Sequence, residues 1–356
     1  MSLMNEEQIN AIVDRVVEQF SPVTSSKKSL EKPKAPKIIS EHSENFGSFS
    51  NSEAAIESAR KAFIEYQSVS IEQRKKIIST IREICLENLE TIARLAHEET
   101  GLGRYEDKIV KNRLAITKTP GVEDLNPIAW TGDNGLTLTE LAPYGVIGAI
   151  TPCTNPTETI ISNSIGMIAG GNAVTFNPHP SAKQCSLFVV GLLNKAIIAA
   201  GGPTNLITTV VNPTIESAQV LMQHPSIALL VVTGGPAVVA AAMKSGKKVI
   251  GAGPGDPPVV VDDTADIDKA ARDIVMSAGT DNNIICIIEK NIIVTKKVAD
   301  ELKKALVKHG AVDLQSYQAK RLEKIIVDGN HPNKKWVGKN IQDILKQIDV
   351  IVDSSK

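Results

Sequence analysis

An α/β fold with an open parallel sheet is predicted by three features of the sequence. From Gly145 onward, short runs rich in Val, Ile and Ala alternate with segments of helical length, the order typical of βαβ units. Ala, Ile and Val dominate the apolar residues, which suits buried parallel strands, and aromatic residues make up only 3%. The chain has 356 residues, more than one core usually holds, so two domains are expected.

The predicted elements follow one another in a regular order. Two helices are expected over 52–66 and 71–100, where Ala, Ile, Leu, Glu and Arg predominate. Strands are then predicted at 146–150, 173–176, 206–211, 227–232 and 248–250, with helices between them at 157–169, 181–200, 214–223 and 236–244. A second segment adds strands at 258–261 and 291–295 and helices at 266–278, 298–308 and 315–328. This order predicts helices on both faces of the sheet.

A separate amphipathic helix is predicted within residues 1–20. Its apolar face carries, at helical spacing, Ile9, Ile12, Val13, Val16, Val17 and Phe20. Asn5 with Gln8 resembles a capping box, and Pro22 ends the pattern. Residues 21–49, rich in Ser, Lys and Pro, predict a flexible linker. Because so short a helix is not stable alone, it needs a groove on a partner or on its own globule, and both alternatives remain open.

Charge and cysteine usage exclude several classes of protein. Lys and Arg number 39 against 40 Asp and Glu, so the net charge of −1 gives no reason to expect nucleic acid or an anionic membrane surface as a partner. The four cysteines, Cys85, Cys153, Cys185 and Cys286, lie far apart, which predicts neither a metal site nor a disulfide framework. No secretory segment or uninterrupted apolar run of membrane-spanning length is found, so a cytoplasmic location with reduced thiols is expected.

The segment around Cys286 carries the strongest signal of chemistry. Its thiol lies between two apolar Ile pairs, just after the polar run Asp281–Asn283. A cysteine at such a boundary suits a nucleophile in a dry pocket, although a small core residue is the alternative. Far upstream, Asn155 in the segment Thr151–Thr157 could supply an amide donor to the oxyanion that attack on a carbonyl creates.

Three loops follow predicted strands and could hold a phosphorylated ligand. They are Phe176–Pro180, Thr233–Pro236 and Gly251–Gly255. Ligands of open parallel sheets bind beyond the carboxyl ends of the strands, and a helix start with small residues before it can hold a phosphate. None of the loops matches GxGxxG with an acidic residue beyond it, so tight turns remain the alternative. His179 is equally open to a role as a loop hydrogen-bonder or as a ligand contact.

Six segments taken together resemble the CoA-acylating branch of the aldehyde dehydrogenase superfamily. They are PYGVIGAITP (143–152), TNPT (154–157), NPHP (177–180), VTGG (232–235), IGAGPGDPPVVVD (250–262) and DNNIICIIEK (281–290). The resemblance covers about residues 50–345 and is greatest to the acetaldehyde and propionaldehyde dehydrogenases of ethanolamine and propanediol utilisation. The order and separation of the TNPT and cysteine segments are its most specific part.

The resemblance implies a reaction and a role for each matching residue. Cys286 would attack the aldehyde, and Asn155 with the backbone N–H of Cys286 would hold the oxyanion. NAD would take the hydride, with NADP as the less favoured alternative, and coenzyme A would take the acyl group from the thioester. The implied cofactor contacts are Thr151, Pro152, Pro178, His179, Thr233, Gly234, Gly251 and Gly253. No metal is implied.

The resemblance also implies an organisation for the whole chain. Residues 50–255 would form the NAD-binding domain and residues 256–356 an incomplete α/β catalytic domain, since members of the family usually continue well beyond Lys356. The absent part would complete the catalytic domain and support a homo-oligomer. The helix at 5–20 would be a targeting peptide that binds a shell protein of a bacterial microcompartment.

The acceptor of the acyl group follows from one local feature. Hydrolytic aldehyde dehydrogenases place a glutamate in the segment that matches Gly251–Gly255, whereas this segment has no carboxylate until Asp256. Without a base for water, a thioester should await a better nucleophile, such as the CoA thiol. The alternatives are a hydrolytic enzyme that uses Asp256 as its base, and a non-catalytic cargo or scaffold protein that binds through residues 5–20.

Overall fold

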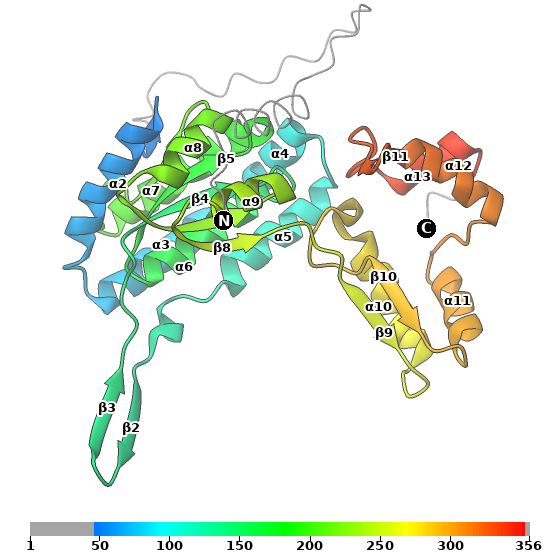
Figure 1. Ribbon diagram of the computed structural model, residues 1–356, viewed down its shortest axis with the longest axis horizontal. Coiled ribbons are helices and arrows are strands. Elements are labelled where there is room, and N and C mark those ends of the chain that lie inside the picture. Colours follow the sequence, from blue (N-terminus) through cyan, green and yellow to red (C-terminus); the bar gives the residue numbers. More distant parts are fainter. Residues whose placement is uncertain (1–45, 353–356) are drawn as a thin grey trace, which may run out of the picture. The chain divides into compact units, whose positions relative to one another are not determined.

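The computed structural model describes residues 46–352, and the predicted α/β class is confirmed (Figure 1). The main sheet has six parallel strands in the order β1-β6-β5-β4-β7-β8. They are β1 Ser48–Phe49, β4 Val146–Thr151, β5 Ala173–Pro178, β6 Ile207–Val210, β7 Ile227–Thr233 and β8 Lys248–Ala252. The predicted helix at 5–20 lies outside the described residues. The predicted linker extends too far, because Ser48–Phe49 already pair with β6.

The order of the strands reverses at β4. From β4 the chain proceeds through β5 to β6 on one side, and it then returns to place β7 and β8 on the other side. The helices around this sheet are α2 Ser52–Tyr66, α3 Ile71–Glu87, α4 Leu89–Thr100, α5 Tyr105–Lys118, α6 Pro156–Ala169, α7 Lys183–Ala199, α8 Ile215–Gln223 and α9 Pro236–Met243. Right-handed crossovers put α6 and α7 on one face and α8 and α9 on the other. A reversal of this kind opens a crevice at the carboxyl ends of the central strands.

Complete burial of the central strands explains their sequences. Every residue of β4 and β5 is buried, so both strands lack the alternation of a half-exposed strand. Among the described residues, one helix, Pro180–Ala199, has the length and composition to cross a membrane. Half of that stretch is buried in the globule, where Val189, Leu193 and Ile197 belong to the main core.

The second segment has a smaller core of its own. Strands β9 Pro258–Val261 and β10 Asn291–Val294, both predicted as strands, pair in parallel. Their apolar residues pack with those of α10 Ile267–Gly279 and α11 Ala299–Lys308. The chain then forms α12 Ser316–Ile326, β11 Val327–Asp328, β12 His331–Pro332 and α13 Ile341–Leu345. The boundary between residues 255 and 256 stays a prediction.

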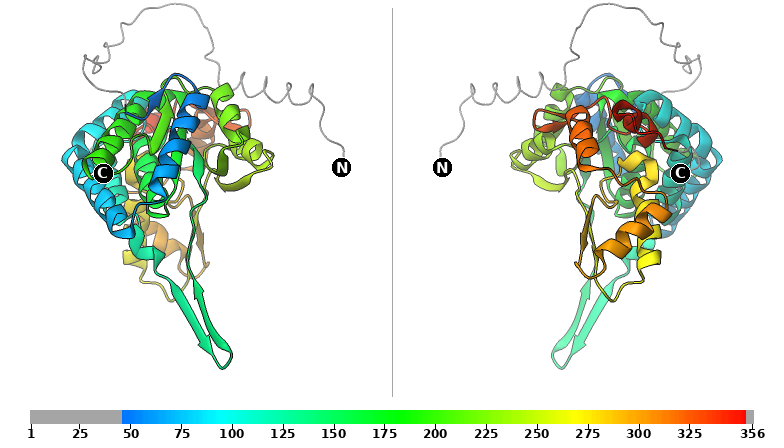
Figure 2. Two further views of the ribbon diagram at one scale, coloured as in Figure 1. Left: turned by 90° about the vertical axis from the view of Figure 1, so that its left-hand side faces the viewer. Right: turned by 90° about the vertical axis from the view of Figure 1, so that its right-hand side faces the viewer.

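Part of the region before β4 differs from the prediction. Residues 71–100 form the two helices α3 and α4 instead of one, because Asn88 leaves the helical region with φ −102° and ψ 11°. Helix α5 and the strands β2 Ile128–Gly132 and β3 Gly135–Thr139 are among the elements with no predicted counterpart. Helix α5 is rich in charged residues, and the hairpin of β2 and β3 is exposed along its whole length (Figure 2).

Candidate active site

The predicted cofactor residues gather at one edge of the main sheet. Thr151 ends β4 and Pro178 ends β5, and these two residues are partners in the parallel register. Thr233 ends β7 beside Ala252, the last residue of β8. The carboxyl ends of four neighbouring strands therefore meet where the strand order reverses, which is the position of ligand crevices in such sheets.

The remaining predicted cofactor residues lie just beyond these strand ends or in β8. Pro152 follows β4, and Gly234 follows β7, where its N–H donates to the carbonyl of Ala252 at 3.0 Å. Gly251 lies within β8, and Gly253 follows that strand. Both glycines are exposed. The structure thus brings together residues that are separated widely in the sequence.

His179 makes a hydrogen bond within its own loop at this edge of the sheet. It precedes the short 3₁₀ helix Pro180–Ala182, and its Nδ1 accepts a hydrogen bond from the N–H of Ser181 at 3.1 Å. Burial, together with the nearby charge of Lys334, lowers the pKa of the imidazole. A neutral ring is therefore the form expected near pH 7.

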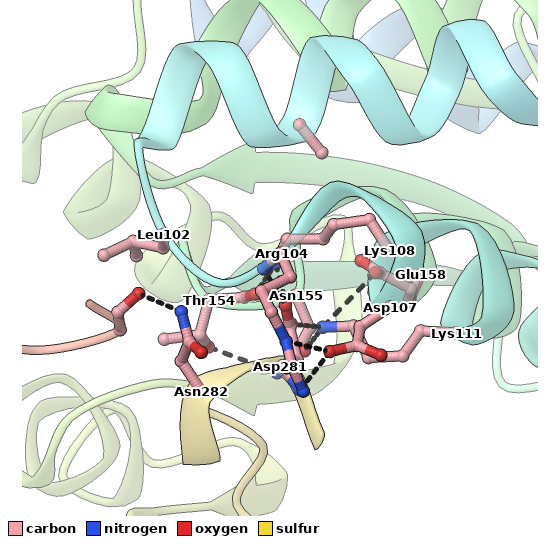
Figure 3. A network of polar contacts seen from close by, with 12 residues as sticks. Leu102, Arg104, Asp107, Lys108, Lys111, Thr154, Asn155, Glu158, Asp281 and Asn282 are labelled. Carbon is pink, nitrogen blue, oxygen red and sulfur yellow. Dashed lines mark hydrogen bonds and ion pairs between the residues drawn. The ribbon is translucent and has the colours of Figure 1, made fainter. Parts of the chain in front are cut away.

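Asn155 lies at the start of α6 but does not cap that helix. It occupies the N-cap position before Pro156, and its side chain makes no capping hydrogen bond. Instead its Oδ1 accepts from Nζ of Lys111 at 2.5 Å, and its Nδ2 donates to Oγ1 of Thr154 at 3.2 Å (Figure 3). An N-cap asparagine that hydrogen-bonds to its own helix usually contributes about 1 kcal/mol to helix stability. The Asn155 side chain gives up this contribution and binds Lys111 and Thr154 instead.

A buried cluster of charges joins Asn155 to the cysteine segment. Asp281 is fully buried and pairs with Lys108 at 3.1 Å and with Lys111 (Figure 3). Lys111 also faces Oε1 of Glu158 at 3.4 Å. The two lysines lie one turn apart on α5, so both ammonium groups reach the same carboxylate. Two positive and two negative groups balance, as burial of charge requires.

The pKa shifts agree with a fully charged cluster, except at one lysine. Burial would raise the pKa of Asp281, but Lys111 and Lys108 hold it below its ordinary value. Burial would lower the pKa of Lys111, but Glu158 and Asp281 raise it above the usual value. Burial and the charge of Lys111 lower the pKa of Lys108. The shifts at Asp281 and Lys111 thus favour their charged forms, whereas the shift at Lys108 opposes its charged form.

The segment before Cys286 has an unusual backbone. Asp281, Asn282 and Asn283 all adopt left-handed conformations, with φ of 49°, 53° and 60°. Asp and Asn tolerate this region better than other side chains do, but the surrounding structure must hold such a run in place. The N–H of Asp281 donates to Oδ2 of Asp107 at 2.8 Å, and Nδ2 of Asn282 donates to the carbonyl of Gly338 at 3.0 Å. These contacts anchor the segment that leads to Cys286.

Cys286 itself is half-buried and lies against the segment that follows β8. A β-carbon on Gly255 would collide with the carbonyl of Cys286, so only glycine fits there. Nearby, Nζ of Lys290 donates to the carbonyl of Ile285 at 3.0 Å. Asp256 is exposed, and its Oδ1 accepts from Nδ2 of Asn291 at 2.8 Å. The loop beside the thiol therefore offers backbone groups and no carboxylate. The first carboxylate after the loop, that of Asp256, is hydrogen-bonded to Asn291.

Sequence reasoning missed the residues that connect the two predicted catalytic groups. No role is predicted from the sequence for Lys108, Lys111 or Glu158, and Asp281 is named there only as part of a polar run. The spacing of the lysines could have indicated them, since two residues three positions apart lie on one face of a helix. The other charged residues of this helix include Glu106 and Asp107 in its first turn. Only the burial of both ammonium groups shows that they need a common anionic partner.

Comparisons with known proteins bear on this site. A family model described as "Aldehyde dehydrogenase family" matches residues 26–315. Among curated relatives, an acetylating acetaldehyde dehydrogenase of Bilophila wadsworthia is 49% identical over 87% of this chain and 66% of its own length. A CoA-propanoylating propanal dehydrogenase of Salmonella typhimurium is 45% identical over 86% of this chain and 66% of its own length.

Solved structures agree with these relatives. A propionaldehyde dehydrogenase from the fucose utilisation microcompartment of Clostridium phytofermentans has a TM-score of 0.83 and 48% identity, over 87% of this chain and 71% of that one. A propionaldehyde dehydrogenase of Rhodopseudomonas palustris, solved with bound CoA and an acylated cysteine, has a TM-score of 0.83, 49% identity and the same coverage.

The extent of these matches defines what they establish. The chain spans 66% of the length of the first curated relatives, slightly less than two thirds. The family model nevertheless covers most of the chain, and the predicted resemblance to CoA-acylating enzymes is confirmed. We conclude that this chain belongs to the aldehyde dehydrogenase family.

Proposed function

We propose that this protein oxidises a short-chain aldehyde, such as acetaldehyde or propionaldehyde, to the acyl-CoA. The observation that carries the proposal is the glycine-rich Gly251–Gly255 segment. It contacts the Cys286 backbone through Gly255 and contains no carboxylate. Several relatives are named as CoA-acylating or acetylating enzymes, which supports the same reaction.

In this proposal Cys286 is the nucleophile. Its thiolate attacks the aldehyde carbon, and the oxygen becomes an oxyanion that the Asn155 amide and the Cys286 N–H would stabilise. Loss of hydride from that carbon leaves a thioester on Cys286. The thiol of CoA then attacks the thioester, and Cys286 departs as a thiolate. Water is a poor competitor because Asp256, the first carboxylate after the glycine segment, is exposed and hydrogen-bonded to Asn291.

NAD is the hydride acceptor in this proposal, and the residues at the sheet edge fit it. Helix α9 begins after Thr233-Gly-Gly, and its N-cap residue Gly235 provides no side-chain cap. The first N–H groups of α9 are therefore available to a phosphate oxygen. Thr233 and Gly234 would hold the pyrophosphate, whereas Pro178 and His179 would face the adenosine end. When bound, NAD would supply the oxidising power for the aldehyde step. An engineered relative was solved with NADP+, so the preference for NAD is part of the proposal.

Location and assembly complete the proposal. Names of similar proteins place some of them in a bacterial microcompartment. We propose that the helix at 5–20 binds a shell protein and that the protein is a cytoplasmic homo-oligomer inside such a compartment. Ile9→Glu combined with Val16→Glu is expected to abolish co-purification with shells and to leave kinetics in solution unchanged. Retained encapsulation of the double variant would contradict the targeting role.

The reaction is tested by NADH formation with propionaldehyde. The parent chain is expected to form NADH only when CoA is present and to yield propionyl-CoA, whereas Cys286→Ala is expected to form none. Equal rates with and without CoA, with propionate as the product, would indicate a hydrolytic enzyme. No NADH under any condition, with encapsulation retained, would indicate a non-catalytic cargo protein.

A further inference from the structure

We infer that Lys111 is a positioning residue for the proposed reaction: its ammonium group orients the carboxamide of Asn155 so that the NH₂ group faces the oxyanion formed at Cys286. The inference rests on the proposed function, because it assigns a task within that site. The contacts that carry it are those of Lys111 with Asn155, Asp281 and Glu158 (Figure 3).

The first step of the argument is the local conformation of Asn155. At an N-cap position an asparagine oxygen normally accepts from an N–H of its own helix. Here that oxygen accepts from Nζ of Lys111 instead, and the side chain caps nothing. The helix start is held by backbone instead, since the carbonyl of Asn155 accepts from the N–H of Thr159 at 3.1 Å. The amide is therefore directed towards α5 and away from α6.

The second step is the chemistry of the pair. A lysine ammonium group has three donors and no acceptor, so only the oxygen of the Asn155 amide can face it. The NH₂ end must then point the other way. One of its protons goes to Oγ1 of Thr154 at 3.2 Å, and the second is left for another acceptor. A flipped amide would present its oxygen to the growing negative charge, so a fixed orientation matters for catalysis.

The third step is the support of Lys111 itself. The side chain is only 9% exposed. Its ammonium group donates a hydrogen bond to Oδ1 of Asn155 and forms ion pairs with Asp281 and, at 3.4 Å, with Oε1 of Glu158. Asp281 belongs to the segment that leads to Cys286. One ammonium group therefore ties the donor amide to the segment of the nucleophile.

Lys108 provides an internal comparison. It pairs with the same Asp281 carboxylate at 3.1 Å, but its second contact is the backbone carbonyl of Thr154 at 2.8 Å. Within residues 46–352, Lys108 forms no hydrogen bond with the Asn155 amide. Replacing Lys108 therefore removes the same charge from the same carboxylate without removing the partner of the amide. Lys75, whose ion pair with Glu72 is exposed, serves as a surface control.

The experiment measures addition of an aldehyde to Cys286 without NAD or CoA. Alkylation of Cys286 by iodoacetamide is followed by mass spectrometry with and without propionaldehyde, and the protection gives an apparent dissociation constant. Cys85 and Cys185 are fully buried and react slowly by comparison; burial raises the pKa of the Cys85 thiol to about 12. Loss of one hydrogen bond to the adduct is expected to weaken protection about 3- to 10-fold in Asn155→Ala and in Lys111→Met.

The double variant distinguishes positioning from general support. Lys111→Met combined with Asn155→Ala is expected to lose no more protection than Asn155→Ala alone, whereas Lys108→Met should add its effect to that of Asn155→Ala. Alkylation without aldehyde forms no oxyanion, so its rate should stay within about 2-fold of the parent in the surface control Lys75→Met. If Lys111→Met does not fold, Lys111→Gln takes its place in the same cycle, because its amide has both donors and an acceptor and so does not fix the orientation of the Asn155 amide.

Three outcomes would overturn the inference. They are losses that multiply in the double variant, unchanged protection in Lys111→Met, and a parent chain that propionaldehyde does not protect. An assay of NADH formation with CoA distinguishes failure of this inference from failure of the proposed function. If the parent chain is protected and the cycle is non-additive but NADH never forms with CoA, the proposed function fails and the positioning role of Lys111 stands. If NADH forms with CoA and the losses in the double variant are additive, the proposed function stands and the positioning role of Lys111 fails.

Discussion

The central strands of the main sheet and the segment around Cys286 are built by different forces. Every residue of β4 and β5 is buried, and their apolar side chains belong to one large core. The stretch from Asp281 to Cys286 has no strand, runs through three left-handed residues, and is held by ion pairs and hydrogen bonds to α5. Burial of apolar surface is non-directional, whereas a charge network fixes particular atoms. The scaffold can therefore tolerate imprecision that the site cannot.

The largest expected effect tests the scaffold side of this comparison. Phe176 in β5 is fully buried. Phe176→Ala is expected to lower the free energy of unfolding by about 3–5 kcal/mol, because it removes a large side chain and leaves a cavity. Urea unfolding followed by circular dichroism measures the change. The loss should be nearly the same at low and high NaCl concentration, and a strong salt dependence would contradict the account of this region.

Removal of the Asp281 carboxylate tests the charge network, which is the other side of this comparison. Asp281→Ala leaves two buried lysines without their partner and is expected to cost about 3–5 kcal/mol of unfolding free energy. Asp273→Ala is the matched control, since its ion pair with Lys269 is exposed, and its urea midpoint should stay at the parent value. A similar loss in both variants would remove the distinction between a buried network and surface charge.

The pH dependence of the Asp281 contribution has a definite sign. The pKa of Asp281 is lower in the folded protein than its ordinary value of 3.8, because Lys111 and Lys108 outweigh the effect of burial. The carboxylate therefore stabilises the fold fully above pH 3.8, and this contribution is lost as the pH falls through the folded-state pKa. Stability curves of the parent and of Asp281→Asn should converge only in that acidic range. Convergence near neutral pH would show that the carboxylate is not paired as described.

A smaller and more local effect is expected at Gly255. A β-carbon there collides with the carbonyl of Cys286, so Gly255→Ala must displace the thiol segment. A shift of about 1 Å can cost about 10²-fold in rate, and a loss of kcat of that order is expected for NADH formation, with little change in stability. Gly191→Ala is the control, since a β-carbon at that position in α7 meets nothing within 4 Å. Unchanged kcat in Gly255→Ala would contradict the contact.

Much of the fold could be predicted because its signals are local. The predicted strand at 258–261 agrees with β9 at both ends, and those at 146–150 and 227–232 differ from β4 and β7 only at the last residue. The predictions failed where apolar periodicity is weak. Helix α5 buries Lys108 and Lys111 on its inner face, so its sequence shows a charged segment where the structure has a packed one. The hairpin β2–β3 is exposed on both faces and gives no burial pattern to follow.

The candidate site shows the same division. Cys286 and Asn155 could be named from their residue types and neighbours, and the predicted cofactor residues lie together at the strand ends. Their catalytic and binding roles stay predictions. Lys111, Asp281 and Glu158 could not be connected, because they come from separate parts of the sequence and their link exists only after folding. An ion pair leaves no periodic trace in a sequence, whereas an amphipathic strand or helix does.

The sequence by itself determined the order of the strands and α-helices from β4 to α12, the family resemblance, the position of the thiol and the absence of a carboxylate from Gly251–Gly255. These are properties of neighbouring residues, and chain connectivity preserves them. Only the tertiary structure decided which buried charges meet and which way the Asn155 amide points. Desolvation makes an unpaired buried charge costly, so the lysines of α5 must meet Asp281 from one distant segment and Glu158 from another, and these ion pairs fix the geometry of the site.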